Sequence, residues 1–545
     1  MIKKIGDLNF GFSDAINYKT REEKERFNQI FIRNSSLSQI YNPKSYFIIG
    51  EKGTGKTAYA VYAANNNMQN TFADIKYVKE TDYVEFVALK EKHHLSLSNY
   101  TVIWKVILFM LLSDNILKTE KGFVSTIFKK FNALQQATED YYHQAFSPEV
   151  ESAFEFITDS KVAAELIHKN LQLKMGVEDS IKVNHTKFQT NLLYIKKSFE
   201  EAFSQLKLKK NHIIFIDGID FRPGGMSHDS YLECIKGLAN AIWDLNTDFF
   251  PNIKDSVGRC KVMLLTRPDI FDSLSLQNTN AKLKDNSVIL NWTTDYKSHR
   301  NSEIFEVTEK LLSSQHENTS NAEKLWDKYF PWNAPNAQYL ESNNNNNNNN
   351  EEEDNNEYTS FVAFLRWSYH KPRDILTMLS ILQNYTDPKD KKSFSLEDFK
   401  NHSFIRAYSN YLLGEVKDQL SFYYESKDYE SFLKFFEFLN GKNKFTYSEY
   451  LSAFNETQEY LESRDSKTPN FMSTANDFLQ FLYGLNIICY METPLKNHAN
   501  VKVVPHWSFR ERNSANISPS VKINAEKYEV FYGLRKALNV EIQTK

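Results

Sequence analysis

The clearest chemical signal in this chain is a stretch of eight residues, GEKGTGKT, which runs from Gly50 to Thr57 and fits the pattern G-x-x-x-x-G-K-[ST] at every fixed position. The apolar residues 46–49 before it predict a short buried strand, and the alanine-rich residues 57–64 after it predict a helix. In such a strand–turn–helix, consecutive backbone N–H groups point inward and the helix start adds partial positive charge. The pattern therefore predicts a phosphate-binding loop.

The types of side chain in this loop suggest a nucleoside triphosphate with Mg²⁺, and we expect ATP. Lys56 is expected to reach the β- and γ-phosphates, and the hydroxyl of Thr57 is expected to bind Mg²⁺. The loop and the start of the helix would contact the nucleotide through Gly50, Glu51, Lys52, Gly53, Thr54, Gly55, Lys56, Thr57 and Ala58. A chance match in a loop is the alternative, and the flanking strand and helix disfavour it.

Two carboxylates follow the next clear core strand. The apolar residues 213–216 predict a strand buried on both faces, and Asp217 ends it. Ligands of open α/β sheets bind at that edge, so Asp217 is expected to hold Mg²⁺ together with Thr57. Asp220, three residues on, is the candidate to orient or deprotonate the attacking water. The structural alternatives are a helix-capping role for Asp217 and a purely structural role for Asp220.

A third strand, residues 261–265, ends in the polar pair Thr266 and Arg267. Thr266 is expected to bond the γ-phosphate or the water, and Arg267 to stabilise developing charge in its own subunit or in a neighbour. The competing interpretation is a structural ion pair between Arg267 and Asp269 or Asp272.

A further polar cluster, residues 370–375, surrounds Pro372, which is suited to the first turn of a helix. Arg373 would lie in that first turn, where a cation opposes the helix dipole. An anionic partner would compensate it, and the nucleotide phosphates would serve. Pairing with Asp374 is the alternative.

These residues must be positioned by a larger framework. Apolar strands alternating with helices predict an α/β fold with a parallel sheet. We predict a core over residues 1–300 with a mostly helical insertion at about 90–210, a helical lid over 301–425, and a winged-helix-like domain over 426–545. The lid contains an Asn-rich segment at 341–357, which is expected to be a disordered loop. Three helices and a β-hairpin in the last domain prompt the winged-helix interpretation.

Composition restricts the function further. The chain has 545 residues and a net charge of −3, which argues against a dominant general affinity for nucleic acid. Three scattered cysteines, Cys234, Cys260 and Cys489, offer neither a disulfide framework nor zinc spacing, and the N-terminus lacks the apolar run of a signal peptide. Residues 102–112 are too short to span a bilayer and predict a buried helix. We expect a cytoplasmic protein without membrane contact.

In their order along the chain, these clusters resemble those of the AAA+/STAND side of the P-loop ATPases, whose sheet has an extra strand between the phosphate loop and the Walker B strand. The sequence DGID from Asp217 to Asp220 is similar to the Walker B form of STAND ATPases, with Gly218 where the catalytic glutamate of typical AAA+ proteins would be. This departure predicts slow hydrolysis.

A closer resemblance is to a bacterial P-loop ATPase family often labelled FunZ-like, found among mobile and antiviral defence genes. It rests on the phosphate loop together with residues 10–15, 266–271, 285–286, 291–292 and 371–374. The resemblance implies a sensor-1 position for Thr266 and a sensor-2-like position in the helical lid for Arg373.

The function we expect is therefore an ATP-dependent regulatory switch, plausible in antiviral defence through the resemblance. Its partners would be ATP, further copies of the chain or a separate effector protein, and DNA through the C-terminal domain, where Arg510, Arg512, Lys522, Arg535 and Lys536 could meet phosphates. Alternatives are a DNA-associated motor or loader, a nucleotide-binding assembly scaffold with negligible turnover and, more weakly, a small-molecule kinase.

Overall fold

The structure is a computed structural model that describes residues 2–78, 97–119, 193, 196–197, 199–222, 226–316, 324–335, 358–387, 391–424, 426–493 and 503–540. The chain divides into two compact units. The sheet unit comprises Asn34–Ile49 and Lys56–Ile289, and the C-terminal unit comprises Met1–Arg33, Gly50–Gly55 and Leu290–Lys545. The predicted Asn-rich loop and much of the predicted insertion at 90–210 lie outside the described residues.

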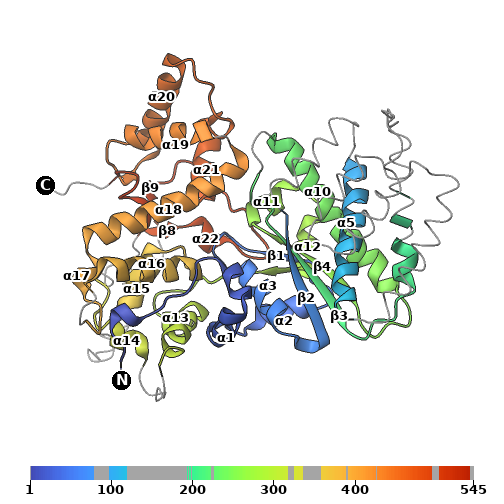
Figure 1. Cartoon of the computed structure of the whole chain (residues 1–545). Helices are drawn as coiled ribbons and strands as arrows, with labels where there is room; N and C mark the ends of the chain where they lie inside the picture. The colour runs from blue at the N-terminus through green and yellow to red at the C-terminus, as the bar shows by residue number, and fades with distance from the viewer. Residues whose placement is uncertain are drawn as a thin grey trace, which may run out of the picture. The chain divides into compact units, whose positions relative to one another are not determined.

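The sheet unit is built on five parallel strands in the order β2-β3-β4-β1-β5 (Figure 1). Their bounds are β1 Phe47–Ile49, β2 Thr71–Tyr77, β3 Asn211–Asp217, β4 Cys260–Thr266 and β5 Ser287–Ile289. In β4 every residue is buried, and in β3 all but the first are, as the continuous apolar runs predicted. The predicted α/β class with a parallel sheet is confirmed.

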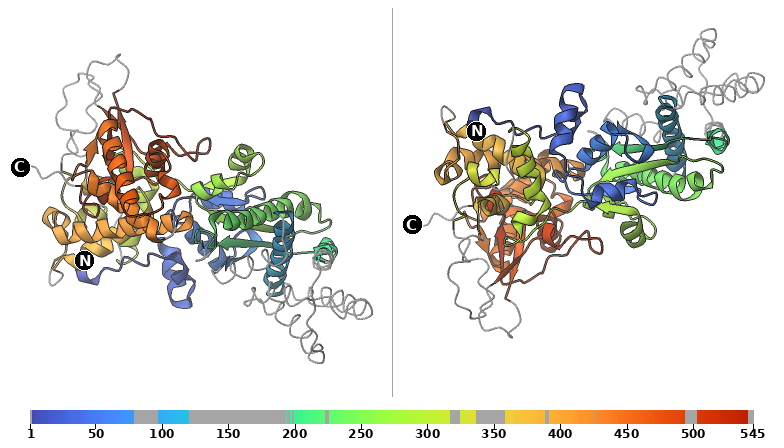
Figure 2. Two further views of the ribbon diagram at one scale, coloured as in Figure 1. Left: turned by 90° about the horizontal axis from the view of Figure 1, so that it is seen from above. Right: turned by 90° about the horizontal axis from the view of Figure 1, so that it is seen from below.

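Helices flank this sheet. Their bounds are α2 Ser35–Tyr41, α3 Lys56–Asn65, α5 Leu97–Leu117, α10 His228–Asp244, α11 Pro268–Ser273 and α12 Thr279–Asn286. Right-handed crossovers require α3 on one face and α5 and α10 on the other, and α5 and α10 pack side by side (Figure 1 and Figure 2). The predicted buried helix over 102–112 is confirmed as the middle of α5. Within the described part of the chain, no helix combines the length and the apolar character needed to cross a membrane.

The strand register places the polar residues that follow the strands along one edge of the sheet. Ile49 at the end of β1 pairs with Thr266 at the end of β4, and Ile216 near the end of β3 pairs with Leu264. Because all these strands are parallel, their carboxyl ends lie along the same edge. The polar residues that follow the strands are thereby brought close together.

The C-terminal unit is mainly helical up to residue 424. Its helices there are α1 Arg21–Ile30, α13 Glu303–Ser313, α14 Leu325–Tyr329, α15 Ser360–Trp367, α16 Pro372–Tyr385, α17 Leu396–Phe399 and α18 His402–Tyr423. A turn at residues 368–371 separates α15 from α16, where His370 adopts a left-handed φ of 53° and Pro372 opens the next helix. Lys371 and Arg373 therefore lie at the start of α16, where this turn ends.

The last part of the unit has the three predicted helices and the predicted hairpin. The helices are α19 Ser426–Phe438, α20 Tyr447–Ser463 and α21 Ala475–Gly484, with the short α22 Ser508–Glu511 further on. Two strands that were not predicted complete an antiparallel sheet of order β6-β9-β7-β8, formed by β6 Lys444–Phe445, β7 Ile488–Glu492, β8 Val504–His506 and β9 Lys527–Val530. Short strands such as β6 carry too little periodicity to be recognised in the sequence.

The packing of α10 on α5 generates a stability prediction. A Cβ on Gly237 of α10 would lie 2.6 Å from the Cβ of Tyr100 in α5, whereas one on Gly414 of α18 would meet nothing within 4 Å. We expect Gly237→Ala to lower the free energy of unfolding by about 1–3 kcal/mol through overpacking. Gly414→Ala is the matched control and should raise it by up to about 1 kcal/mol, because alanine favours the helix. Calorimetric unfolding of both variants checks the opposite signs, and equal shifts would contradict the close packing.

Candidate functional site

The start of α3 and the end of β3 meet through the two predicted Mg²⁺ ligands. The hydroxyl of Thr57 donates to Oδ2 of Asp217 at 2.7 Å, and the Gly218 N–H donates to Oδ1 of Asp217 at 2.8 Å. A hydroxyl and a carboxylate are hard oxygen ligands of the kind that Mg²⁺ binds through one or two protein groups. No group of three or more His, Cys, Asp or Glu side chains suited to a metal occurs among the described residues. The pair therefore fits Mg²⁺ that keeps water or phosphate oxygens as its other ligands.

Asp217 is buried, with 8% of its surface exposed, and burial raises the pKa of its carboxyl. The hydrogen bond from Thr57 opposes this shift, the charge of Asp220 adds to it, and the ammonium of Lys56 opposes it. Burial penalises the charged carboxylate because water no longer solvates it. A bound cation would relieve that penalty, so the electrostatics of the site favour one.

Lys56 and Asp220 form the second pair of the site. The Nζ atom of Lys56 lies 3.5 Å from Oδ2 of Asp220, and the lysine is only 6% exposed. The other oxygen, Oδ1 of Asp220, is buried and accepts no hydrogen bond within the described residues. The structure thus brings together four of the predicted site residues: Lys56, Thr57, Asp217 and Asp220.

The backbone also accounts for the glycine between these two acids. Gly218 has a φ of 93°, a region that residues with a side chain rarely adopt, and a Cβ there would lie 2.9 Å from the carbonyl oxygen of Val78. A glutamate at this position would therefore require the neighbouring backbone to move. Asp220 remains the acid beside Lys56.

Thr266 and Arg267, at the end of β4, are both buried. The Thr266 hydroxyl donates to the carbonyl of Arg267 at 3.3 Å. The Arg267 guanidinium is 2% exposed and makes two bonds to Asp269, from Nε to Oδ1 at 3.1 Å and from Nη2 to Oδ2 at 2.7 Å. The structural pairing that competed with a catalytic role is thus present for Arg267.

In the C-terminal unit, three carbonyls of the loop residues Gly50–Gly55 accept hydrogen bonds. The Thr54 N–H and hydroxyl both donate to the Glu51 carbonyl, at 3.2 and 2.8 Å. The indole N–H of Trp292 donates to the Thr54 carbonyl at 2.9 Å, and the Arg373 N–H donates to the Gly53 carbonyl at 3.3 Å. Because these carbonyls are engaged by the unit itself, an anion would be recognised by the N–H groups of the loop.

Arg373 lies beside the loop. Its Cβ would be 3.2 Å from a Cβ added to Gly53, its Nε donates to the Ser13 carbonyl at 3.0 Å, and its Nη1 lies 3.7 Å from Glu415. Asp374 instead accepts the Tyr369 N–H at 3.1 Å. The arginine is thus next to the phosphate loop and pairs with Glu415.

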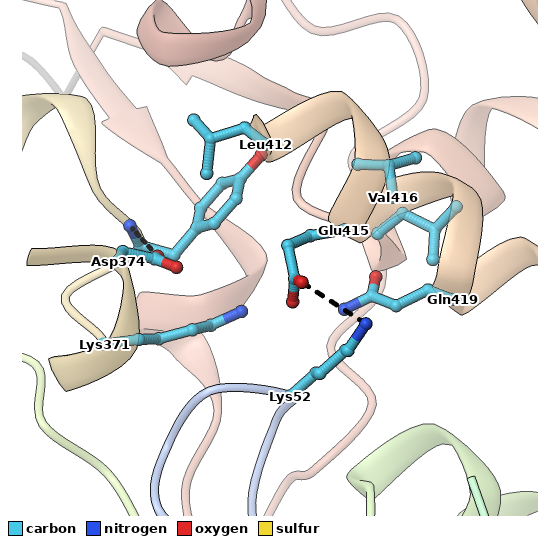
Figure 3. A pocket seen from close by; sticks show the side chains of 9 residues that line it. Lys52, Lys371, Asp374, Leu412, Glu415, Val416 and Gln419 are labelled. Atoms are coloured by element: carbon cyan, nitrogen blue, oxygen red, sulfur yellow. Dashed lines mark hydrogen bonds and ion pairs between the residues drawn. The ribbon is translucent and has the colours of Figure 1, made fainter. Parts of the chain in front are cut away.

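A small pocket adjoins the loop within the C-terminal unit (Figure 3). Lys52 points into it and pairs with Glu415 at 3.3 Å and with Asp418 at 2.5 Å. Lys371 and Asp374 line its other side, from the start of α16. The side chain of Lys52 is therefore directed at carboxylates of α18, and its predicted contact with nucleotide would be made by its backbone N–H.

The sequence did not indicate the partners of Glu51. This buried carboxylate accepts from Lys371 Nζ at 2.5 Å, from Arg512 Nη1, and from Asn486 Nδ2 at 3.2 and 3.3 Å. Although burial opposes ionisation, the charges of Lys371 and Arg512 together with these bonds hold its pKa at about 2. The partners lie up to 461 positions away in the chain, so no local pattern could have revealed them.

Several of the cations expected to meet DNA phosphates are compensated by carboxylates. Arg512 pairs with Glu51, Lys522 with Glu492, and Arg535 with Glu529. Arg510 lies over the ring of Tyr296, 5.1 Å from its centre. Three of the five cations expected to meet DNA phosphates are therefore paired with carboxylates of the same unit.

Neither a scan against protein-family models nor a comparison with curated proteins finds a match to the chain. The chemistry of the site is therefore argued from its residues. The contacts that carry it are Thr57 with Asp217 and Lys56 with Asp220 in the sheet unit, and Arg373 with the loop in the C-terminal unit.

The environment of Asp374 generates a pH prediction. Burial, aided by the charge of Glu415 and opposed by Lys371, the Tyr369 N–H and Arg373, raises its pKa from 3.8 to about 6. A carboxyl whose pKa is higher in the folded state binds more protons when folded, so its contribution to stability is lost as pH rises from about 4 to 6. The loss amounts to roughly 3 kcal/mol.

Asp374→Asn should abolish this loss, because the amide oxygen can still accept the Tyr369 N–H but does not titrate. Thermal unfolding between pH 4 and 7 should show the variant gaining stability over wild type as pH rises, most at pH 7. Parallel curves for the two proteins would contradict the raised pKa. Asp229→Asn, at a side chain that is 99% exposed, controls for the loss of a carboxylate.

Proposed function

We propose that this chain binds ATP with Mg²⁺, hydrolyses it slowly and acts as a regulatory switch. The observation that carries the proposal is the 2.7 Å hydrogen bond between Thr57, at the end of the phosphate-loop motif, and Asp217, at the tip of a parallel strand. A phosphate-loop sequence alone can arise by chance. A chance match would not be expected to place its threonine against a buried acid at the end of another strand of the sheet.

Each residue has a role in the proposed reaction. The loop N–H groups and the Lys56 ammonium bind the phosphates of ATP. Thr57 and Asp217 would hold Mg²⁺, which when bound neutralises phosphate charge. The oxygen of the attacking water forms a bond to the γ-phosphorus, and Asp220 accepts a proton from that water. The bond between the γ-phosphorus and the bridging oxygen breaks, which releases phosphate and ADP.

The framework supports placing the chain with the AAA+/STAND side of the P-loop ATPases, in a FunZ-like family. β4 lies between β1 and β3 in the sheet, as the resemblance implies for an extra strand between the phosphate loop and the Walker B strand. Arg373 contacts Gly53 from the first turn of α16, as expected of a sensor-2-like residue. Three helices and a hairpin support a winged-helix-like C-terminal domain. The resemblance extends the proposal to bacterial antiviral defence.

In this proposal the C-terminal domain transmits the nucleotide state to a partner. Pairing of Arg512, Lys522 and Arg535 with carboxylates favours a protein partner over DNA, since compensated cations bind phosphates weakly. A second function, a nucleotide-binding scaffold without turnover, is favoured by Gly218, which supplies no catalytic acid. The two functions differ only in whether bound ATP is hydrolysed.

Removing the ammonium of Lys56 tests ATP binding. Lys56→Ala should weaken ATP affinity by at least about 100-fold, because a charge-assisted bond to phosphate is lost. Isothermal titration calorimetry with Mg²⁺ measures the change. The matched control is Lys105→Ala, which removes a lysine of the same unit that pairs with Asp244 at 2.6 Å, and it should bind ATP like wild type. Wild-type affinity in the Lys56 variant would overturn the proposal.

Asp220→Asn tests hydrolysis separately from binding. The amide cannot accept the proton of the attacking water, so kcat should fall by about 100-fold or more while the Kd for ATP changes by less than about 3-fold. Phosphate release at saturating ATP measures kcat, and calorimetry measures Kd. If kcat is unchanged, Asp220 is structural. If wild type itself binds ATP but releases no phosphate, the scaffold function is the right one.

A further inference from the structure

The second residue of the phosphate loop is a buried anion held by distant parts of the C-terminal unit. Glu51 is 9% exposed, and both of its carboxylate oxygens are bonded: Lys371, Asn486 and Arg512 surround it. We call these four residues the Glu51 hub. A buried carboxylate is tolerated only when it is paired and hydrogen-bonded, so the hub must stay assembled whenever the loop has this conformation.

The partners in the hub belong to different elements. Lys371 is the N-cap residue of α16, two residues before Arg373. Asn486, in a left-handed conformation with φ of 60°, follows α21, and its Oδ1 accepts the Phe509 N–H at 2.8 Å. Arg512 is the C-cap residue of α22, and its Nη2 donates to the Gly484 carbonyl at 2.6 Å. The hub therefore joins the loop to the end of α21 and to α22.

Separating Glu51 from its partners would be costly. The ammonium of Lys371 and the guanidinium of Arg512 would then lose the carboxylate that compensates them, and the buried carboxylate would lose both cations, which is strongly unfavourable. Any displacement of the loop when it closes on phosphates must therefore move the carboxylate together with its partners. The loop is additionally held at the next residue. Lys52 pairs there with Glu415 of α18 (Figure 3) and also with Asp418 of the same helix.

We propose that Glu51 is a positioning residue that couples ATP binding at the phosphate loop to the segment from the end of α21 to α22, through Asn486 and Arg512. The inference rests on the proposed function, since it presumes that ATP binds the loop. Coupling of this kind is reciprocal. If ATP binding stabilises the assembled hub, then the assembled hub raises the affinity for ATP by the same factor. Glu51 acts through the loop backbone and is not itself a catalytic residue.

The test is amide hydrogen exchange of the full chain with and without Mg-ATP, read at residues 484–487 and 508–512. In wild type, ATP should slow exchange there, at the Phe509 amide above all, by about 5-fold or more. In Glu51→Gln and Arg512→Met, saturating ATP should leave exchange there unchanged, and the affinity for ATP should fall by about 5-fold or more. Arg512→Lys keeps one ion pair to Glu51 and should restore part of the effect.

The matched control breaks another ion pair of the same unit. Arg535 and Glu529 pair at 13% and 15% side-chain exposure, and Arg535→Met should keep the wild-type response to ATP. A purely structural role for the hub would lower thermal stability in the Glu51 and Arg512 variants but keep the ATP response, which overturns the inference. The inference is also overturned if wild type binds ATP and the exchange at residues 484–487 and 508–512 does not change. This outcome needs no folded variant. Absence of ATP binding by wild type in calorimetry is a different result, because it refutes the proposed function itself.

Discussion

Two segments 160 positions apart are joined where the hydroxyl of Thr57 meets the carboxylate of Asp217. The acid lies at the buried tip of β3, where water hardly solvates it, so it needs donors from the protein. The Thr57 hydroxyl and the Gly218 N–H supply them, and the charge of the nearby Lys56 ammonium also favours the carboxylate. This requirement fixes the start of α3 against the end of β3, and every role proposed for the site depends on that placement.

The charged side chains near the start of the phosphate-loop motif are likewise paired with opposite charges. Glu51 and Lys52 are variable positions of the motif, and neither is needed to bind phosphate. In this chain both are charged, and both are neutralised within the C-terminal unit, Glu51 by Lys371 and Arg512 and Lys52 by carboxylates of α18. The loop is thus anchored by the side chains at its variable positions. The residues at its fixed positions are those that the phosphate-binding motif requires.

Gly218 connects this geometry to the rate of the proposed reaction. A side chain at that position would press against the carbonyl of Val78, so the strand end that positions Asp217 excludes a glutamate next to it. An acid can follow only after the turn, where Asp220 lies near Lys56. In the proposed reaction this arrangement leaves Asp220 as the acid that accepts the proton of the attacking water, in place of a residue next to Asp217.

The sequence by itself determined the phosphate-loop motif, the parallel α/β core and the acid at the tip of β3, because each of these depends on consecutive residues and on local apolar patterns. It left open whether Arg267 pairs with Asp269 and gave no sign of the partners of Glu51. Only the tertiary structure showed these contacts: Arg267 pairs with Asp269, and Glu51 is held by Lys371, Asn486 and Arg512. A buried charge must find a partner, but which partner it finds depends on how segments hundreds of positions apart pack together, and no local pattern records that.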